Sequence, residues 1–119
     1  MTIKEALAKI LAQLYVWRIR KWAKAPLKTQ KKVLKKLIFK AKHTSFGKDH
    51  HFEKIKSYKD LTSKTQVKDY EGLRPYIERV VRGEKNVLWP GKPVYFAKTS
   101  GTTSGTKYIP ISKDSMPTH

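Results

Sequence analysis

A run of eight small residues constrains the fold of this chain more than any other stretch of the sequence. Residues 99–106 contain only Thr, Ser and Gly, and Lys107 follows them directly. Short apolar runs lie on both sides, at residues 94–97 and 108–111. Apolar runs of this length, bounded by Gly and Ser, are typical of strands. The sequence therefore predicts two strands joined by a loop that is held at both ends.

The composition of this loop favours a ligand rich in negative charge. Hydroxyl and backbone N–H groups donate hydrogen bonds, and glycine tolerates the positive φ angles that a donor-lined concavity needs. The loop contains no carboxylate, and Lys107 adds a positive charge at its rim. These features suit a polyphosphate. The alternative is a flexible Ser/Thr/Gly loop without a ligand, because such blocks are also common in linkers.

Two common phosphate-binding fingerprints do not fit the spacing of the loop. A Walker A loop has glycine directly before its lysine and a hydroxyl residue directly after it. Here Thr106 separates Gly105 from Lys107, and Tyr108 follows the lysine. The dinucleotide-binding G-x-G-x-x-G pattern also fails, since Gly101 and Gly105 are the only glycines in the loop and no helix follows directly.

A set of segments in fixed order carries a resemblance to a known family. The segments are Thr44-Ser45-Phe46-Gly47-Lys48, Tyr70-Glu71-Gly72-Leu73-Arg74-Pro75-Tyr76-Ile77-Glu78-Arg79-Val80, Gly83-Glu84, Leu88-Trp89-Pro90-Gly91, residues 99–105 and Tyr108-Ile109-Pro110. The loop itself resembles the T-S-G-T-T-x-x-x-K phosphate loop of the adenylate-forming enzymes, with Ser104-Gly105-Thr106 where Gly-Lys-Pro is usual. Together the segments resemble the amino-terminal part of the auxin-responsive (Gretchen Hagen-type) acyl acid–amido synthetase family, bacterial branch.

This resemblance implies a fold and a reaction. The fold class is α/β, seen in this chain as α+β: amino-terminal helices followed by the first strands of a large adenylation domain. The reaction is that of an ATP-dependent ligase, which activates a carboxylic acid as acyl-AMP and conjugates it to an amine, usually an amino acid. ATP and Mg²⁺ are the implied cofactors, without identifiable magnesium ligands. Family members are several times longer, so we expect an amino-terminal fragment that is inactive alone.

The resemblance also implies a nucleotide phosphate site, made of Thr99, Ser100, Gly101, Thr102, Thr103, Ser104, Gly105 and Lys107. The four hydroxyl residues at positions 100 and 102–104 would donate hydrogen bonds to phosphate oxygens. The two glycines would permit close approach of the backbone, and Lys107 would neutralise charge. Catalytic residues are not identifiable, and the pockets for the carboxylate, the amine and adenine are expected downstream.

The chain is strongly basic. It has 27 Lys and Arg against 9 Asp and Glu, a net charge of +18, and no acidic residue between Glu5 and Asp49. Such a balance suits nucleic acid, an anionic membrane or an acidic protein surface, and a slice of a larger protein can also show it. We do not expect nucleic acid as the partner, because no zinc finger, RNP aromatic pair or bZIP heptad is present. A basic nucleic-acid-binding or membrane-surface-binding module remains the alternative to the ligase.

The cysteine count, the positions of the histidines and the hydropathy of the sequence limit the other classes of protein to which this chain could belong. There is no cysteine, so neither a disulfide framework nor a thiolate metal site is expected. His43, His50 and His51 lie close in sequence, but an adjacent pair rarely binds one ion, and no metal site is predicted. No signal peptide is recognisable, and no apolar run approaches the ~18 residues of a membrane span. We therefore expect a cytoplasmic protein.

Hydrophobic periodicity predicts three amphipathic helices. Thr2 and Glu5 form a capping box for the first, which Pro26 stops, and the second covers residues 27–42. The third covers residues 71–82, with a looser turn before Pro75 and a stop at Gly83. Residues 57–68 carry only weak short-helix and turn signals, and Ser112 is expected to cap a further helix.

The predicted domains are residues 1–25, an amino-terminal amphipathic basic helix, and residues 26–119, the start of the adenylation domain. Aromatic and basic residues interleave near Trp17 and Trp22, which suits a membrane interface. Packing of this helix on the rest of the protein is the more usual explanation. Peripheral membrane contact through residues 2–24 therefore stays open.

Overall fold

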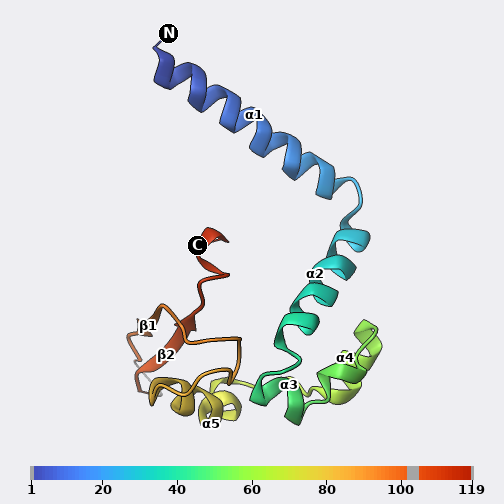
Figure 1. Ribbon diagram of the computed structural model, residues 1–119, viewed down its shortest axis with the longest axis vertical. Helices are drawn as coiled ribbons and strands as arrows, with labels where there is room; N and C mark the ends of the chain where they lie inside the picture. The colour runs from blue at the N-terminus through green and yellow to red at the C-terminus, as the bar shows by residue number, and fades with distance from the viewer. Residues whose placement is uncertain (1, 102–104, 119) are drawn as a thin grey trace. The chain divides into compact units, whose positions relative to one another are not determined.

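A computed structural model describes residues 2–101 and 105–118 of the chain (Figure 1). Packing divides the chain into two compact units, residues 1–34 and 35–119, and each is described by itself. The predicted domain division between residues 25 and 26 stays a prediction.

The first unit contains α1 (Ile3–Ala23) and the beginning of α2 (Pro26–Ala41). The predicted capping box is confirmed, because the Glu5 N–H donates to Thr2 Oγ1 at 3.3 Å and the Thr2 N–H donates to Glu5 Oε2 at 2.9 Å. Pro26 opens α2, where its missing N–H costs nothing because first-turn N–H groups lack intrahelical partners. The predicted stop of the first helix is thus confirmed, since α1 ends at Ala23, three residues before Pro26. The second helix is also confirmed, with each end one residue earlier than the predicted range 27–42.

In the second unit, α2 leads into α3 (Ser45–Asp49) and the short 3-10 helix η1 (Phe52–Lys54). Thr44 caps α3: its Oγ1 accepts a hydrogen bond from the Gly47 N–H at 3.0 Å and donates one to the Ala41 carbonyl at 2.7 Å. A side chain at Gly47 would overlap the same carbonyl, so glycine is required there. The family-like segment at residues 44–48 is therefore a tight helix start in which Thr44 and Gly47 are buried.

The small core of the second unit joins segments that are far apart in sequence. The N–H groups of Ser45 and Phe46 donate to the carbonyls of Asn86 and Val87, at 2.8 and 2.9 Å. This pins the start of α3 to the loop before the first strand. The buried side chains are those of Ala41, Thr44, Phe52, Ile77, Val80 and Val87.

The helix α4 (Tyr58–Lys64) is better defined than its weak sequence signal suggested. Ser57 and Asp60 form a second capping box, in which the Asp60 N–H donates to Ser57 Oγ at 3.2 Å and the Ser57 N–H donates to Asp60 Oδ2 at 2.9 Å. Hydrogen bonds from the backbone of Lys56 and from Ser57 lower the pKa of the Asp60 carboxyl group. The N-terminal cap, rather than an apolar stripe, defines this helix.

The helix α5 (Tyr70–Val81) corrects the prediction of a looser turn before Pro75. The helix already begins at Tyr70, because Asp69 caps it by accepting a hydrogen bond from the Gly72 N–H at 2.9 Å. Pro75 therefore lies inside the helix rather than in its first turn. Gly83, with a φ of +91°, follows the helix closely, as predicted.

The strands β1 (Tyr95–Thr99) and β2 (Lys107–Ile111) form an antiparallel two-stranded sheet in the described part of the chain. Figure 1 shows this hairpin next to α5, and β2 packs against that helix. Ser112 Oγ accepts a hydrogen bond from the Ser115 N–H at 3.2 Å, as a cap would, but a turn and the 3-10 helix η2 (Met116–Thr118) follow instead of an α-helix. The predicted α+β class is confirmed.

Candidate nucleotide-phosphate site

The β1–β2 hairpin holds the small-residue loop by its base. Thr99 lies directly opposite Lys107 at the end of the ladder, so both residues belong to strands rather than to the loop. Tyr95 lies opposite Ile111 at the other end, and the Val94 N–H extends the pairing by donating to the Ile111 carbonyl at 2.8 Å. The predicted strand–loop–strand arrangement is therefore confirmed. Three of the predicted site residues, Thr102, Thr103 and Ser104, lie outside the described residues.

Both glycines of the loop stand where another residue would be strained. The backbone at Gly101 approaches Gly105 so closely that a Cβ at Gly101 would overlap the Gly105 carbonyl. Gly105 itself has a φ of +78°, in the left-handed region that favours glycine. The loop is therefore narrow at the point where it leaves the two strands. Ser100 and Gly105 are exposed there, which leaves room for a ligand beside the backbone.

Tyr70, the first residue of α5, positions the end of the loop. Its hydroxyl oxygen accepts a hydrogen bond from the Tyr108 N–H at 2.9 Å. The ammonium group of Lys107 lies 5.6 Å from the centre of the Tyr70 ring, within the range of a cation–π contact. α5 thus fixes the strand that carries the predicted phosphate-neutralising lysine. Tyr70 belongs to the family-like segment at residues 70–80, and its place in the sequence gives no sign of a role in the site.

A cavity of about 300 Å³ lies beside the described end of the loop. Arg74 Nη2 donates to Glu71 Oε1 at 2.8 Å, and Arg82 Nη1 lies 4.0 Å from Glu78 Oε2, so both cations at this cavity have local acidic partners. The residues that line the cavity come from α5 and from the loop and strand: Tyr70, Arg74, Ile77, Glu78, Val81, Arg82, Thr106 and Tyr108.

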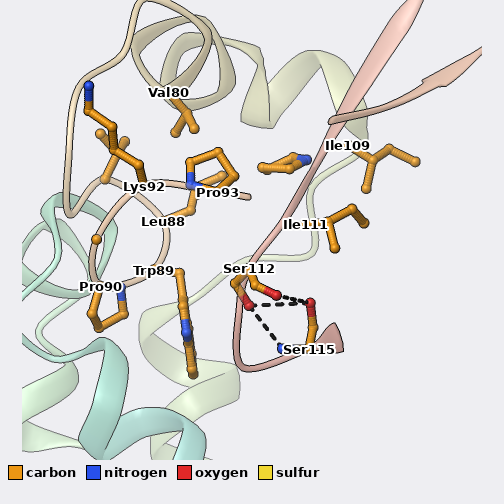
Figure 2. A pocket seen from close by; sticks show the side chains of 13 residues that line it. Val80, Leu88, Trp89, Pro90, Lys92, Pro93, Ile109, Ile111, Ser112 and Ser115 are labelled. Carbon is orange, nitrogen blue, oxygen red and sulfur yellow. Dashed lines mark hydrogen bonds between the residues drawn. The ribbon is translucent and has the colours of Figure 1, made fainter. Parts of the chain in front are cut away.

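A second cavity, of about 370 Å³, is mainly apolar (Figure 2). It lies between residues 87–93, β2 and the turn that follows β2, and Val80 of α5 adds to its wall. Figure 2 shows Trp89, Ile111 and Ser112 around it. Asn86, with a φ of +58°, shapes the loop at residues 86–91 by accepting a hydrogen bond from the Gly91 N–H at 2.7 Å. The family-like segment at residues 88–91 thus forms one wall of a cavity.

Asp114 ties this wall to α2. Its Oδ2 accepts hydrogen bonds from Lys40 Nζ at 2.6 Å and from Trp89 Nε1 at 3.2 Å. These two contacts, that of Lys40 first, lower the pKa of the Asp114 carboxyl group. Lys40 is therefore one basic residue of α2 whose charge is compensated within its own unit.

The histidines do not form a metal centre in the described part of the chain. His50 stacks on Phe46 with 4.0 Å between ring centres, and its Nδ1 lies 2.9 Å from the Phe46 carbonyl. Residues 2–101 and 105–118 contain no group of three or more His, Cys, Asp or Glu that could hold a metal ion.

Comparison with known proteins places the chain in a family. The family model described as "GH3 family N-terminal domain" matches residues 16–119. The chain therefore belongs to the GH3 family, the auxin-responsive family that its sequence resembles. Assignment to a bacterial branch stays a prediction.

Two curated relatives come from Arabidopsis thaliana. Indole-3-acetic acid-amido synthetase GH3.2 is 28% identical over 92 residues, which cover 76% of this chain and 17% of the relative. Indole-3-acetic acid-amido synthetase GH3.3 is 27% identical over 89 residues, which cover 73% of this chain and 15% of the relative. The chain thus matches about one sixth of the length of these relatives. Among its described residues, no helix has the length and apolar character needed to cross a membrane.

Proposed function

We propose that this chain supplies the nucleotide phosphate loop of an ATP-dependent, AMP-forming acyl acid–amido synthetase. One observation carries the proposal: a hairpin closed by Thr99 and Lys107 brings two glycines together at the base of a hydroxyl-rich loop, next to a cavity. Membership of the GH3 family and the names of the two relatives support the same reaction.

The chemistry of the proposed loop is electrostatic. Phosphoryl and nucleotidyl transfers depend mainly on positioning and on stabilisation of negative charge. The hydroxyl and N–H groups of residues 99–106 donate to phosphate oxygens, and Lys107 neutralises part of their charge. Tyr70 holds that lysine in place from α5.

The proposed reaction has two steps. A carboxylate oxygen of the acyl substrate attacks the α-phosphorus of ATP, which forms acyl-AMP and releases pyrophosphate. The nitrogen of an amine or amino acid then attacks the acyl carbon, which forms an amide and releases AMP. Mg²⁺ would enter with the phosphates of ATP, since the described residues offer no carboxylate cluster for it. The pockets for the acyl group, the amine and adenine belong to further parts of the enzyme.

Amide NMR spectra of the 119-residue chain, titrated with MgATP and with pyrophosphate, test this proposal. We expect shifts at residues 99–107 and at Tyr108. Lys107→Gln should weaken binding at least tenfold, because it removes a charge-assisted contact to phosphate. Lys98→Gln is the matched control: it removes the same charge from the neighbouring ladder pair, on the opposite face of the hairpin.

Two results would contradict the proposal. One is an absence of shifts in the loop at millimolar MgATP and pyrophosphate. The other is equal loss of binding in the two lysine variants, which would mean that net charge attracts phosphate without a site.

In an enzyme that carries this segment, Ser100→Ala combined with Thr102→Ala should also strongly reduce ATP–pyrophosphate exchange, while the circular dichroism spectrum stays unchanged.

A further inference from the structure

The first helix carries large apolar side chains that are not buried within its own unit. No residue of α1 is buried, and Ile3, Leu7 and Trp17 expose 90%, 58% and 59% of their surface. Contiguous exposed apolar surface of this kind marks a site of interaction with a partner or a membrane. The exposed large apolar residues of α1 are Ile3, Leu7, Ile10, Leu11, Leu14, Tyr15, Val16, Trp17, Ile19 and Trp22.

These side chains occupy more than one side of α1: Val16 and Ile19 lie opposite the row described next, and Lys21 lies in line with that row. Ile3, Leu7, Ile10, Leu14 and Trp17 follow one another at intervals of four and three residues, which places them along one face. We call these five residues the apolar face of α1. Leu11 and Trp22 lie in a row next to it, so the apolar surface is wider than a coiled-coil seam.

The charge of α1 identifies the partner that suits this face. The helix and its C-cap carry six basic residues and one acidic residue, Glu5, which caps the helix. Within residues 2–101 and 105–118, none of these six basic side chains lies in an ion pair with a carboxylate. The ammonium nitrogen of Lys21, Nζ, instead lies 5.2 Å from the centre of the Trp17 ring, within the range of a cation–π contact. The six basic residues are Lys4, Lys9, Arg18, Arg20, Lys21 and Lys24.

The family match begins at residue 16, inside α1, so residues 3–15, which hold most of the apolar face, lie outside the matched stretch. No described helix is apolar enough to span a bilayer, so α1 would lie in the surface rather than cross it.

We propose that α1 docks on an anionic lipid surface. The apolar face enters the boundary between headgroups and acyl chains, Trp17 and Trp22 lie at headgroup level, and the lysines and arginines contact anionic headgroups. A basic helix with an apolar face and interfacial aromatic residues binds membranes through apolar burial together with attraction to anionic lipid. This inference does not depend on the proposed ligase activity.

Flotation of the full chain with vesicles tests the proposal. Vesicles of phosphatidylcholine with 30% phosphatidylserine should carry the chain upward, whereas pure phosphatidylcholine should bind it at least tenfold less. Each basic residue near the surface contributes about fivefold in partitioning at low salt. Binding to the anionic vesicles should therefore fall strongly between 50 and 500 mM NaCl.

A pair of charge-matched variants separates the apolar face from net charge. Leu7→Glu with Leu14→Glu adds two negative charges on the apolar face and should lower vesicle binding more than a hundredfold. Ala8→Glu with Ala12→Glu adds the same charge on the other side of the helix, at exposed positions, and should lower binding much less. Circular dichroism with vesicles absent checks that both variants keep their helix content.

Four results would overturn the proposal. The first is no flotation with anionic vesicles. The second is an equal effect of the two double variants, which would reduce the interaction to net charge. The third is a chain that does not bind vesicles and forms a dimer in light scattering, where the dimer is lost only in the Leu7→Glu, Leu14→Glu variant. In that case a second copy of the chain would cover the apolar face. The fourth is tight binding of duplex DNA by the native chain and by both double variants, with no flotation of the chain on vesicles. This result would assign the basic residues to nucleic acid and refute the membrane proposal.

Discussion

At the scale of single residues, the hydroxyl group of Thr44 has an outsized structural role. Thr44 is only 1% exposed, and its Oγ1 satisfies the Gly47 N–H while donating to the Ala41 carbonyl. A buried N–H group without a partner destabilises a fold more than a surface hydrogen bond stabilises it. The start of α3, and through it the contacts to Asn86 and Val87, depend on this one oxygen.

We therefore predict that Thr44→Val destabilises the chain by about 1–3 kcal/mol, because valine keeps the shape but leaves the Gly47 N–H unsatisfied. Thr44→Ser is the matched control, since it keeps the hydroxyl and removes only a buried methyl group. Urea unfolding followed by circular dichroism measures both. Equal or greater destabilisation by Thr44→Ser would mean that methyl packing, not the hydrogen bond, stabilises this corner.

At the scale of elements, α5 connects the core to the candidate site. Ile77 and Val80 are buried in the core, and Tyr70 holds β2 at the other end of the helix. Arg79 adds a link to α3 by donating to Ser45 Oγ at 2.8 Å. Pro75 lies inside this helix and removes one of its hydrogen bonds, because proline has no N–H to donate to the Glu71 carbonyl one turn earlier.

We predict that Pro75→Ala stabilises the chain by about 2 kcal/mol. An interior proline costs roughly 3 kcal/mol, and the greater freedom of the unfolded alanine chain offsets up to about 1 kcal/mol of the gain. Pro90→Ala serves as the control, because Pro90 is exposed and lies outside a helix. The substitution there should only destabilise the chain, by up to about 1 kcal/mol, through the greater freedom of the unfolded state. A lower urea midpoint for Pro75→Ala would show that the proline geometry itself is needed in α5.

At the scale of the whole molecule, the few acidic residues are tied to specific partners. Glu84 Oε2 accepts a hydrogen bond from Arg79 Nε at 2.8 Å, and this bond lowers the pKa of the carboxyl group. The pKa values of Asp60 and Asp114 are lowered as well, by backbone and side-chain donors. With a net charge of +18, protonation of any of them also adds to the repulsion within the chain.

We predict that stability falls as the pH drops below about 4.5. Because these folded-state pKa values lie below the ordinary 3.8 for Asp and 4.5 for Glu, the carboxylates stabilise the fold fully above those values. Their contribution is lost as the pH falls through each folded-state pKa. Thermal unfolding between pH 3 and 7 measures the effect. The difference between the native chain and Glu84→Gln should shrink below pH 4.5, and a constant difference would contradict the assignment to Glu84.

Short-range patterns in the sequence determined much of this protein. The capping box of Thr2 and Glu5, the boundary at Pro26 and the two strands around residues 99–106 were all predictable. The physical reason is that caps, prolines and short apolar runs act through neighbours a few residues away. The hydroxyl-rich composition of the loop is a local feature of the same kind, and by itself it predicts a phosphate ligand.

Only the tertiary structure decided how distant segments meet. That Tyr70 holds Tyr108 and Lys107, that Thr44 is buried, and that a cavity lies between α5 and the end of the loop all depend on contacts across tens of residues. For the start of α5, two local signals in the sequence disagreed. Asp69 caps a helix that begins at Tyr70, whereas proline prefers the first turn of a helix, and the structure follows the cap. A single sequence carries no local signal for long-range contacts, because they are set by packing and by the pairing of buried polar groups.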